Sequence, residues 1–332
     1  MDVGITEQIC KAFLIALVIS LILGPIFIPF LKRFKLGQNI RHDGPSRHLA
    51  KAGTPTMGGV IFLVGMIVSL LYIGRSYSEA LIIGGITLGF GLIGFLDDFI
   101  KIVMKRSLGL RAREKLLGQI LLATLLGVLA INLLDGNQGI IIPFSGLFTD
   151  QPTHISLNPL FFIIFTIIVV VATSNAVNLT DGLDGLATGV SLVAAVAFAV
   201  IGVLSGQPGV AYAMAALAGS CLGFLFFNRH PARVFMGDTG SLALGASLST
   251  AAVLTGTELY LLIIGGIFVL EALSVIIQVF SFQLLGHRVF KMSPLHHHFE
   301  LVGWSEQKVV YVFWTGALVF ALLGLAGFNS LL

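Results

Sequence analysis

Carboxylates at the ends of apolar segments are the residues of this sequence best suited to chemistry. Asp97 and Asp98 end one apolar run, and Asp238 follows a glycine at the start of another. An unpaired carboxylate beside hydrocarbon is costly, so such residues mark functional sites. Carboxylate oxygens favour Mg²⁺, and Mg²⁺ acting with Lys and Arg is the usual equipment of phosphoryl transfer. These residues therefore predict magnesium-dependent chemistry at a phosphate.

A second polar segment, residues 175–189, follows another apolar run and contains Asn175, Asn178, Asp181 and Asp184. The two aspartates are spaced i,i+3 and could share one face of a helical turn. Three glycines in the segment permit close approach of the backbone to a ligand. A helix cap is the structural alternative, but the segment holds more polar side chains than a cap needs. We therefore expect it to contribute to the site.

Three consecutive histidines, His296, His297 and His298, stand in a further polar loop. They suggest zinc, but neither an HExxH motif nor a cysteine pair accompanies them. Because three consecutive residues do not easily converge on one ion, we expect a functional role without zinc. Cys10 and Cys221 lie far apart and are expected to be structural.

Two lysines are the basic counterparts of these acids. Lys51 precedes a run rich in Gly, Thr and Pro, and Lys115 begins another apolar segment. Either lysine could bind phosphate, or could simply be one of the positive charges that cytoplasmic loops accumulate. Taken alone, each lysine is better explained as one of these positive charges, but the Gly, Thr and Pro setting of Lys51 raises its case for phosphate.

The elements that position these residues are apolar helices. Of 332 residues, 56% are hydrophobic and 11% charged, against roughly 25% charged in a soluble domain. The composition predicts an all-α polytopic membrane protein with a single transmembrane domain over residues 1–332, and the net charge of +3 is too small to indicate nucleic acid. Runs long enough to cross a bilayer number ten: 11–31, 57–73, 79–100, 116–134, 159–174, 186–204, 210–227, 241–257, 259–285 and 309–329.

The distribution of positive charge orients these segments. With both termini outside, 17 of the 19 Lys and Arg residues fall on one side, and only Lys11 and Arg75 fall on the other. Because cytoplasmic loops carry the excess of Lys and Arg, that side is predicted to be cytoplasmic. The ninth segment is long and carries Glu271 and Gln278, so we expect it to tilt or break. A small hairpin is predicted near residues 139–142.

Six motifs resemble the polyprenyl-phosphate N-acetylhexosamine-1-phosphate transferase superfamily, over essentially the whole chain. They occupy residues 41–45, 53–59, 94–98, 175–187, 235–238 and 294–298. The histidine triplet is similar to that of the muramoyl-pentapeptide branch and distinguishes it from the branches that use GlcNAc-phosphate.

The resemblance implies a reaction. UDP-N-acetylmuramoyl-pentapeptide and undecaprenyl phosphate would give lipid I and UMP with Mg²⁺, the first membrane step of peptidoglycan synthesis. It also implies a bacterial inner-membrane protein with a cytoplasmic active site, ten helices with the ninth broken, a homodimer, and sensitivity to nucleoside antibiotics.

The resemblance also implies roles by motif position. Asp238 is the main metal ligand, with Asn178 and Asp181 near the metal and the pyrophosphate. Asp97 is the general base, supported by Asp98, and Lys115 binds phosphate. The uridine pocket comprises Lys51, Asp184 and Phe235, which stacks on the base. The sugar and nucleotide cleft is lined by Thr56, Asn228, Ser241, Gln278 and His297. Further catalytic or substrate-binding positions are His296, His297, Asn175 and His298.

Two alternatives remain open at this point. One is a sibling transferase that uses UDP-GlcNAc, against which the histidine triplet argues. The other is an ion-coupled transporter with intramembrane acids such as Glu271. Against the transporter, the acids gather at one face rather than at the midplane, and no inverted repeat is apparent. The sequence leaves open a covalent intermediate; we favour a single displacement, because a phosphate dianion is already a competent nucleophile.

Overall fold

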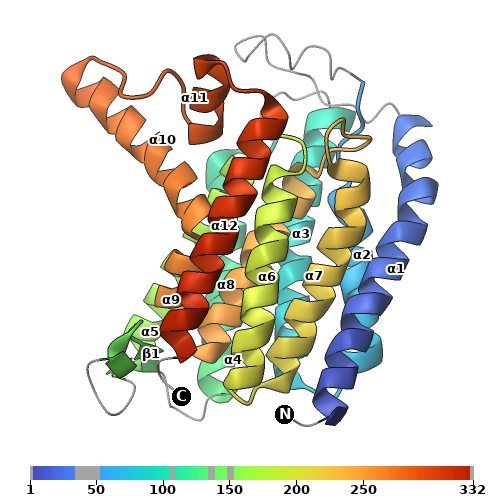
Figure 1. Ribbon diagram of the computed structural model, residues 1–332, viewed down its shortest axis with the longest axis vertical. Coiled ribbons are helices and arrows are strands. Elements are labelled where there is room, and N and C mark those ends of the chain that lie inside the picture. Colours follow the sequence, from blue (N-terminus) through green and yellow to red (C-terminus); the bar gives the residue numbers. More distant parts are fainter. Residues whose placement is uncertain (1–2, 34–52, 105–108, 134–138, 148–152, 330–332) are drawn as a thin grey trace.

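The chain folds into a bundle of helices (Figure 1). The computed structural model describes residues 3–33, 53–104, 109–133, 139–147 and 153–329. The helices are α1 (Val3–Arg33), α2 (Gly59–Ser69), α3 (Ser78–Val103), α4 (Ala112–Leu133), α5 (Pro159–Thr180), α6 (Leu186–Leu204), α7 (Pro208–Asn228), α8 (Gly237–Thr255), α9 (Glu258–Ile264), α10 (Gly266–Leu285), α11 (Leu295–Val302) and α12 (Glu306–Asn329). The strands are β1 (Gly139–Ile141) and β2 (His154–Ser156).

Eight of the described helices are long and apolar enough to cross a membrane: α1, α3, α4, α5, α6, α7, α10 and α12. A shorter apolar helix, Gly59–Gly74, is formed by α2 and one π-helical turn. The expectation of an all-α multi-pass membrane protein is therefore confirmed.

Helix α8 is the centre of the bundle. Every residue from Thr239 to Thr255 is buried, and the helix packs mainly against α3 and α5. Glycines allow the close approach: Gly94 of α3 lies against the backbone of Asp238, and Gly245 of α8 lies against the backbone of Ser174. A β carbon at either glycine would collide with the neighbouring backbone. The start of α8 is thereby held between α3 and α5.

The predicted ninth segment contains two helices. α9 ends at Ile264 and α10 begins at Gly266, so the division falls at Gly265. Glu271 and Gln278 both lie within α10. The end of α10 leans away from the bundle, and α11, which carries the histidine triplet, lies between that end and α12 (Figure 1).

The small hairpin is also present. β1 and β2 pair antiparallel, with Gly139 opposite Ser156 and Ile141 opposite His154. The backbone N–H of Ile141 donates to the carbonyl of Gly256, 2.8 Å away, at the end of α8. The sheet therefore lies at the end of the bundle where α8 terminates, together with the first residues of α1 and the last residues of α12 (Figure 1).

Candidate active site

Asp238, in the first turn of α8, gathers side chains from three other helices. Its Oδ2 lies 3.1 Å from Nζ of Lys101 on α3 and 2.9 Å from Nζ of Lys115 on α4. Its Oδ1 accepts a hydrogen bond of 2.9 Å from the amide of Asn178 on α5. A carboxylate is also favoured at a helix N-terminus by the helix dipole. These contacts place Asp238 at the centre of the site.

Asp98 faces the start of α8. It accepts hydrogen bonds from the backbone N–H of Thr239 at 2.9 Å, from the Thr239 hydroxyl at 2.7 Å and from the N–H of Asp238 at 3.2 Å. Asp98 and Thr239 are 141 residues apart. Asp98 therefore satisfies N–H groups that the first turn of a helix leaves unpaired, and fixes α8 against α3.

Asp97, one residue earlier, has different partners. Its carboxylate pairs with Lys101 one turn along α3 and accepts a hydrogen bond of 2.8 Å from the N–H of Leu110. Gly109 has a φ of +61°, and a β carbon there would lie 2.5 Å from the Asp97 carboxylate. The two adjacent aspartates therefore have different surroundings.

Oxygen atoms of Asp97, Asp98 and Asp238, which we call the reaction cluster, all lie within 4.8 Å of one another. Three carboxylates at this spacing form the hard-oxygen donor set that Mg²⁺ prefers. The two lysines already offset part of the negative charge, so the site also has cations for phosphate oxygens. The residues therefore fit a divalent ion bound beside a phosphate.

Asp181 lies just beyond α5, near the reaction cluster. Burial, together with the negative charges of Asp238, Asp98 and Asp184, raises the pKa of the Asp181 carboxyl well above its usual value. A bound cation would reverse this penalty, because an opposite charge favours the ionised form.

The first histidine of the triplet is fully buried beside Asp181. Nδ1 of His296 lies 3.1 Å from the Glu271 carboxylate, which also accepts from the His296 backbone N–H at 3.2 Å. The His296 ring presses on Gly182 and leaves no room for a β carbon there. Glu271, the acid within the predicted ninth segment, thus has His296 as its partner. The His296 ring of this pair supports the 181–185 turn.

The other two histidines face different groups. Nδ1 of His297 lies 2.9 Å from Glu300, and His298 accepts a hydrogen bond of 3.2 Å from the N–H of Lys291. The three histidines therefore contact different polar groups.

Several predicted substrate-binding amides bond to the protein itself. Asn228 donates to the carbonyl of Val234 at 3.1 Å and accepts from the Thr188 hydroxyl at 2.7 Å. Gln278 accepts from the N–H and donates to the carbonyl of Phe290, each at 2.9 Å. Both amides therefore shape loops at this end of the bundle, and their contact with substrate stays a prediction.

Three further predicted residues lie in the part of the chain that the structure describes. Asn175 donates to the side chain of Gln119 at 2.8 Å. The Ser241 hydroxyl accepts from the Asn178 amide at 2.8 Å. Thr56 is buried. The carbonyl of Pro55, the residue before it, accepts a hydrogen bond of 2.8 Å from the Phe235 N–H. Lys51 lies outside the described residues.

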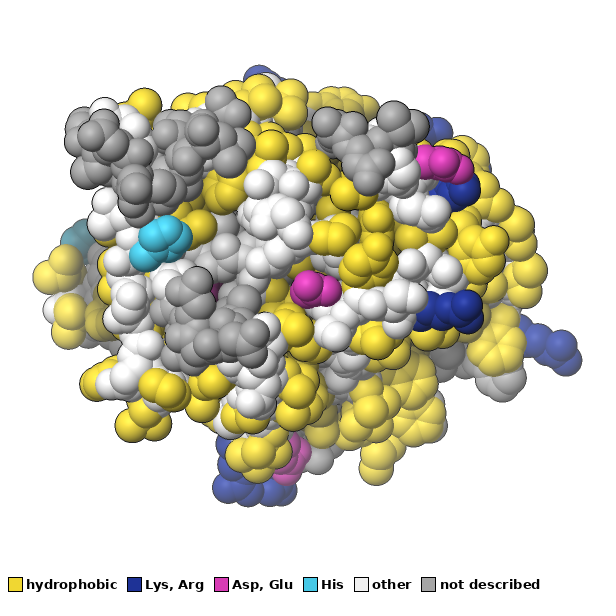
Figure 2. All heavy atoms as spheres, turned by 90° about the horizontal axis from the view of Figure 1, so that it is seen from below, with side chains coloured by type: hydrophobic (Ala, Val, Ile, Leu, Met, Phe, Trp, Pro, Cys, Tyr) yellow, Lys and Arg dark blue, Asp and Glu magenta, His cyan; other side chains and the backbone are white. Residues whose placement is uncertain are grey.

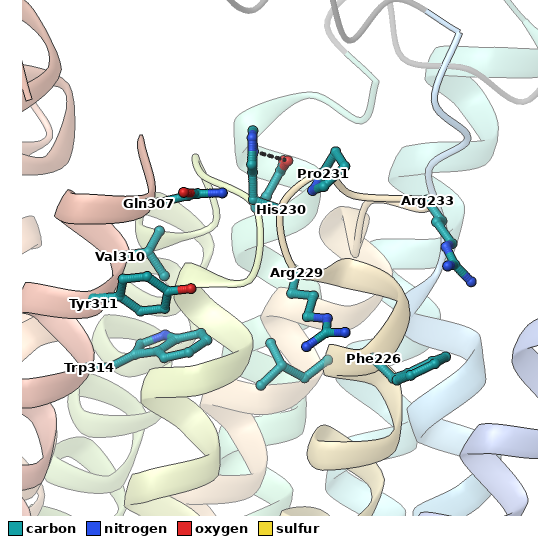
Figure 3. A pocket seen from close by; sticks show the side chains of 11 residues that line it. Phe226, Arg229, His230, Pro231, Arg233, Gln307, Val310, Tyr311 and Trp314 are labelled. Atoms are coloured by element: carbon teal, nitrogen blue, oxygen red, sulfur yellow. Dashed lines mark hydrogen bonds and ion pairs between the residues drawn. The ribbon is translucent and has the colours of Figure 1, made fainter. Parts of the chain in front are cut away.

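A second cluster, Asp184, His230 and Glu306, lies nearby, and we call it the loop cluster. Nδ1 of His230 is 3.1 Å from Asp184 and 3.5 Å from Glu306. Asp184 also accepts from the N–H of Ala232 at 3.0 Å, and Glu306 accepts from the N–H of Asp184 at 2.9 Å. These bonds tie together the α5–α6 loop, the α7–α8 loop and the start of α12. Figure 3 marks the contact of the His230 ring. Asp184, predicted in the uridine pocket, thus turns one carboxylate oxygen toward His230.

Lys101, His230 and Glu306 were not among the predicted site residues. The spacing of Lys101, four residues after Asp97, was a usable signal. For His230 and Glu306 no local pattern exists, because they meet Asp184 only through the packing of three separate segments.

Comparison with known proteins agrees with this geometry. Residues 80–256 match a family model described as glycosyl transferase family 4, and residues 51–63 match a phospho-N-acetylmuramoyl-pentapeptide-transferase signature. A protein of Pelotomaculum thermopropionicum is 60% identical over 98% of this chain and 99% of its own length. One of Desulforudis audaxviator is 56% identical over 96% of this chain and 97% of its own. Both carry the name phospho-N-acetylmuramoyl-pentapeptide-transferase.

Proposed function

Because the chain belongs to the phospho-N-acetylmuramoyl-pentapeptide-transferase family, we propose that it moves phospho-N-acetylmuramoyl-pentapeptide from a UDP-linked donor to undecaprenyl phosphate. The products are lipid I and UMP. The observation that carries this proposal is the reaction cluster with its two lysines, held at one end of a membrane-embedded bundle. There a soluble nucleotide can meet a lipid phosphate.

In the proposed reaction an oxygen of the lipid phosphate attacks the β-phosphorus of the donor. A new pyrophosphate bond forms, the bond between the two phosphates of the donor breaks, and UMP leaves with the bonding electrons. Lys101 and Lys115 bind phosphate oxygens and offset the repulsion between the two anions. Asp97 accepts the proton when the lipid phosphate arrives as a monoanion.

The metal role follows from the same residues. Asp238 and Asn178 would hold Mg²⁺, with Asp98 fixing α8 so that Asp238 keeps its place. Mg²⁺, when bound, neutralises charge on the transferring phosphoryl oxygens. The remaining proposed contacts are those of the sequence assignment. Lys51, Asp184 and Phe235 contact the uridine, and the sugar and nucleotide cleft is lined by Thr56, Asn228, Ser241, Gln278 and His297.

We also propose ten crossings with both termini outside and the reaction cluster on the cytoplasmic side of the inner membrane. The eight long apolar helices, α10 among them, give eight crossings. Helices α2 and α8 give two more, and the short α9 belongs to the same crossing as α10. Figure 2 views the bundle from the end opposite the reaction cluster. Over the described part of that face, most of the surface is hydrophobic side chains, uncharged polar side chains and backbone, and the Lys and Arg side chains lie toward the edge. This distribution supports the positive-inside orientation. The homodimer stays a prediction.

UMP release from the purified protein tests the proposed function. We expect release only with UDP-N-acetylmuramoyl-pentapeptide, undecaprenyl phosphate and Mg²⁺ together. Release with UDP-GlcNAc in place of the muramoyl donor would instead indicate the sibling transferase. Flux of a substrate into liposomes without UMP release would indicate a transporter.

A further inference from the structure

A cavity of about 390 Å³ opens on the side of the bundle between α7 and α12, near the loop cluster. Its walls include Phe226 and Arg229 from the end of α7, and Tyr311 and Trp314 from the start of α12 (Figure 3). The α7–α8 loop adds His230 and closes one end of the cavity (Figure 3). Asp184 of the loop cluster also lines the cavity. Apart from the assignment of Asp184 to the uridine pocket, none of the roles proposed above uses this space.

The cavity has the chemistry of the boundary between headgroups and hydrocarbon. Tyr311 is 60% exposed, and Trp314 donates its ring N–H to the carbonyl of Gly185 at 3.3 Å. Tyr and Trp gather at membrane interfaces because each joins an apolar ring to a polar group. Further along α7 and α12, Leu222 and Leu318 continue the exposed surface. A hydrocarbon chain leaving the cavity would therefore follow an apolar path.

Two arginines give the cavity a positive charge. The guanidinium groups of Arg229 and Arg233 lie 5.6 and 5.7 Å from the centre of the Phe226 ring. Among the described residues, neither arginine forms an ion pair with a carboxylate, whereas the neighbouring acids Asp184 and Glu306 face His230.

The direction of Arg229 is informative. An arginine near a membrane normally extends its charge toward water, but the Arg229 side chain runs between Trp314 and Phe226 into the cavity (Figure 3). An anion at the depth of the headgroups would explain this direction. Basic pockets between transmembrane helices bind anionic lipid headgroups in this way.

We propose that this cavity binds an anionic glycerophospholipid of the surrounding leaflet. Arg229 contacts its phosphate, Tyr311 and Trp314 contact the glycerol region, and one acyl chain lies along α7 and α12. Arg229 also begins the loop that leads to Asp238, so the bound lipid would steady the segment connecting the two carboxylate clusters. The inference needs only the membrane setting of the chain and does not depend on the identity of the transferred group.

The chain offers a probe inside the cavity. It contains two tryptophans, and Trp304 lies away from the cavity, stacked on Phe299 with the ring centres 4.6 Å apart. In a Trp304→Phe protein, Trp314 is the sole tryptophan. Phosphatidylglycerol brominated on its acyl chains should quench Trp314 fluorescence more than brominated phosphatidylcholine at equal mole fraction. Equal quenching by the two lipids would overturn the proposal.

Arg229→Gln should reduce the preference for phosphatidylglycerol about fivefold, the contribution of one interfacial arginine. Arg288→Gln is the matched control, because Arg288 also lies over a phenylalanine ring, Phe282, at 5.8 Å, but outside the cavity. The control should keep the full preference. An unchanged preference in Arg229→Gln would contradict the assignment.

Two measurements on the Trp304→Phe protein need no further variant. The preference for phosphatidylglycerol should fall as salt rises, because interactions between exposed charges are screened; a preference independent of salt counts against the arginine. Unlabelled phosphatidylglycerol should displace the brominated lipid at least as well as undecaprenyl phosphate does. Much stronger displacement by undecaprenyl phosphate would assign the cavity to the acceptor substrate and refute the phospholipid proposal.

Discussion

The reaction cluster and the loop cluster satisfy the same distance criterion for a metal ion, yet they are neutralised differently. Lysines at 2.9 and 3.1 Å neutralise Asp238, whereas His230 and the backbone N–H of Ala232 contact the Asp184 carboxylate. A lysine keeps its charge on a flexible stem and can turn to a phosphate. A carboxylate bound by loop N–H groups holds those loops in place. The partners of a carboxylate cluster, more than its spacing, therefore indicate whether it performs chemistry or fixes loops.

The largest expected effect comes from replacing Asp238, the central residue of the reaction cluster. Asp238→Ala should lower the rate of UMP release by about 10³-fold or more, because positioning a metal and two lysines contributes several kcal/mol at the transition state. Glu7→Gln, an exposed acid paired with Lys11, is the control and should keep the full rate. Substantial activity in a folded Asp238→Ala protein would remove Asp238 from the site.

Asp97→Asn removes a base but keeps the shape of the side chain. We expect the rate to fall about 10² to 10⁴-fold, the usual contribution of a general base. The loss should shrink as pH rises and the lipid phosphate becomes a dianion. UMP release should be measured between pH 6 and 9. A loss of rate that does not depend on pH would indicate that Asp97 interacts with a charged group and does not accept a proton.

Phe235 lies on the loop between the two clusters and tests how that loop reaches the nucleotide. Phe235→Ala should weaken competitive uridine-containing inhibitors by about 1–3 kcal/mol, the contribution of stacking on a base. Phe226→Ala, near the end of α7 beside the cavity, is the control. Equal affinity of the Phe235→Ala protein and the parent in a titration would place uridine elsewhere.

Glu306→Ala tests whether the loop cluster is structural. Loss of the hydrogen bond from the Asp184 N–H should cost about 1 kcal/mol and lower the melting temperature by a few degrees. His230→Gln should give a similar loss, and the double variant less than the sum, since both residues belong to one network. A large fall in kcat with unchanged melting temperature would instead give the loop cluster a role in chemistry.

The last prediction concerns the pH dependence of stability through Asp181, whose pKa is raised by burial and by the charges of both clusters. Because its pKa is raised in the folded protein, the folded state holds the proton more tightly than the unfolded state. Stability should therefore decrease as pH rises from about 4 through the raised pKa, by at most about 1.4 kcal/mol per pH unit. Melting temperatures in a chelator should show a shallower decrease in Asp181→Asn. An identical slope in both proteins would show that Asp181 does not carry the effect.

Much of the fold could be read from the sequence, because hydrocarbon imposes strict local rules. Long apolar runs predict helices, and the cost of charge in a membrane places Asp97, Asp98 and Asp238 at helix ends. The division of the ninth segment was harder to locate. Glu271 and Gln278 drew attention to α10, but the break lies at Gly265, and Glu271 stays inside a continuous helix because His296 satisfies it.

By itself, the sequence determined the membrane class, the helices and a reacting face rich in acids. Only the tertiary structure decided which acids meet. Asp98 reaches Thr239 across 141 residues because Gly94 lets α3 approach the backbone of α8. Asp184 turns toward His230 because two loops and α12 converge there. Spacing along a chain defines the face of a helix on which a residue lies, but the partner of that face depends on how distant helices pack.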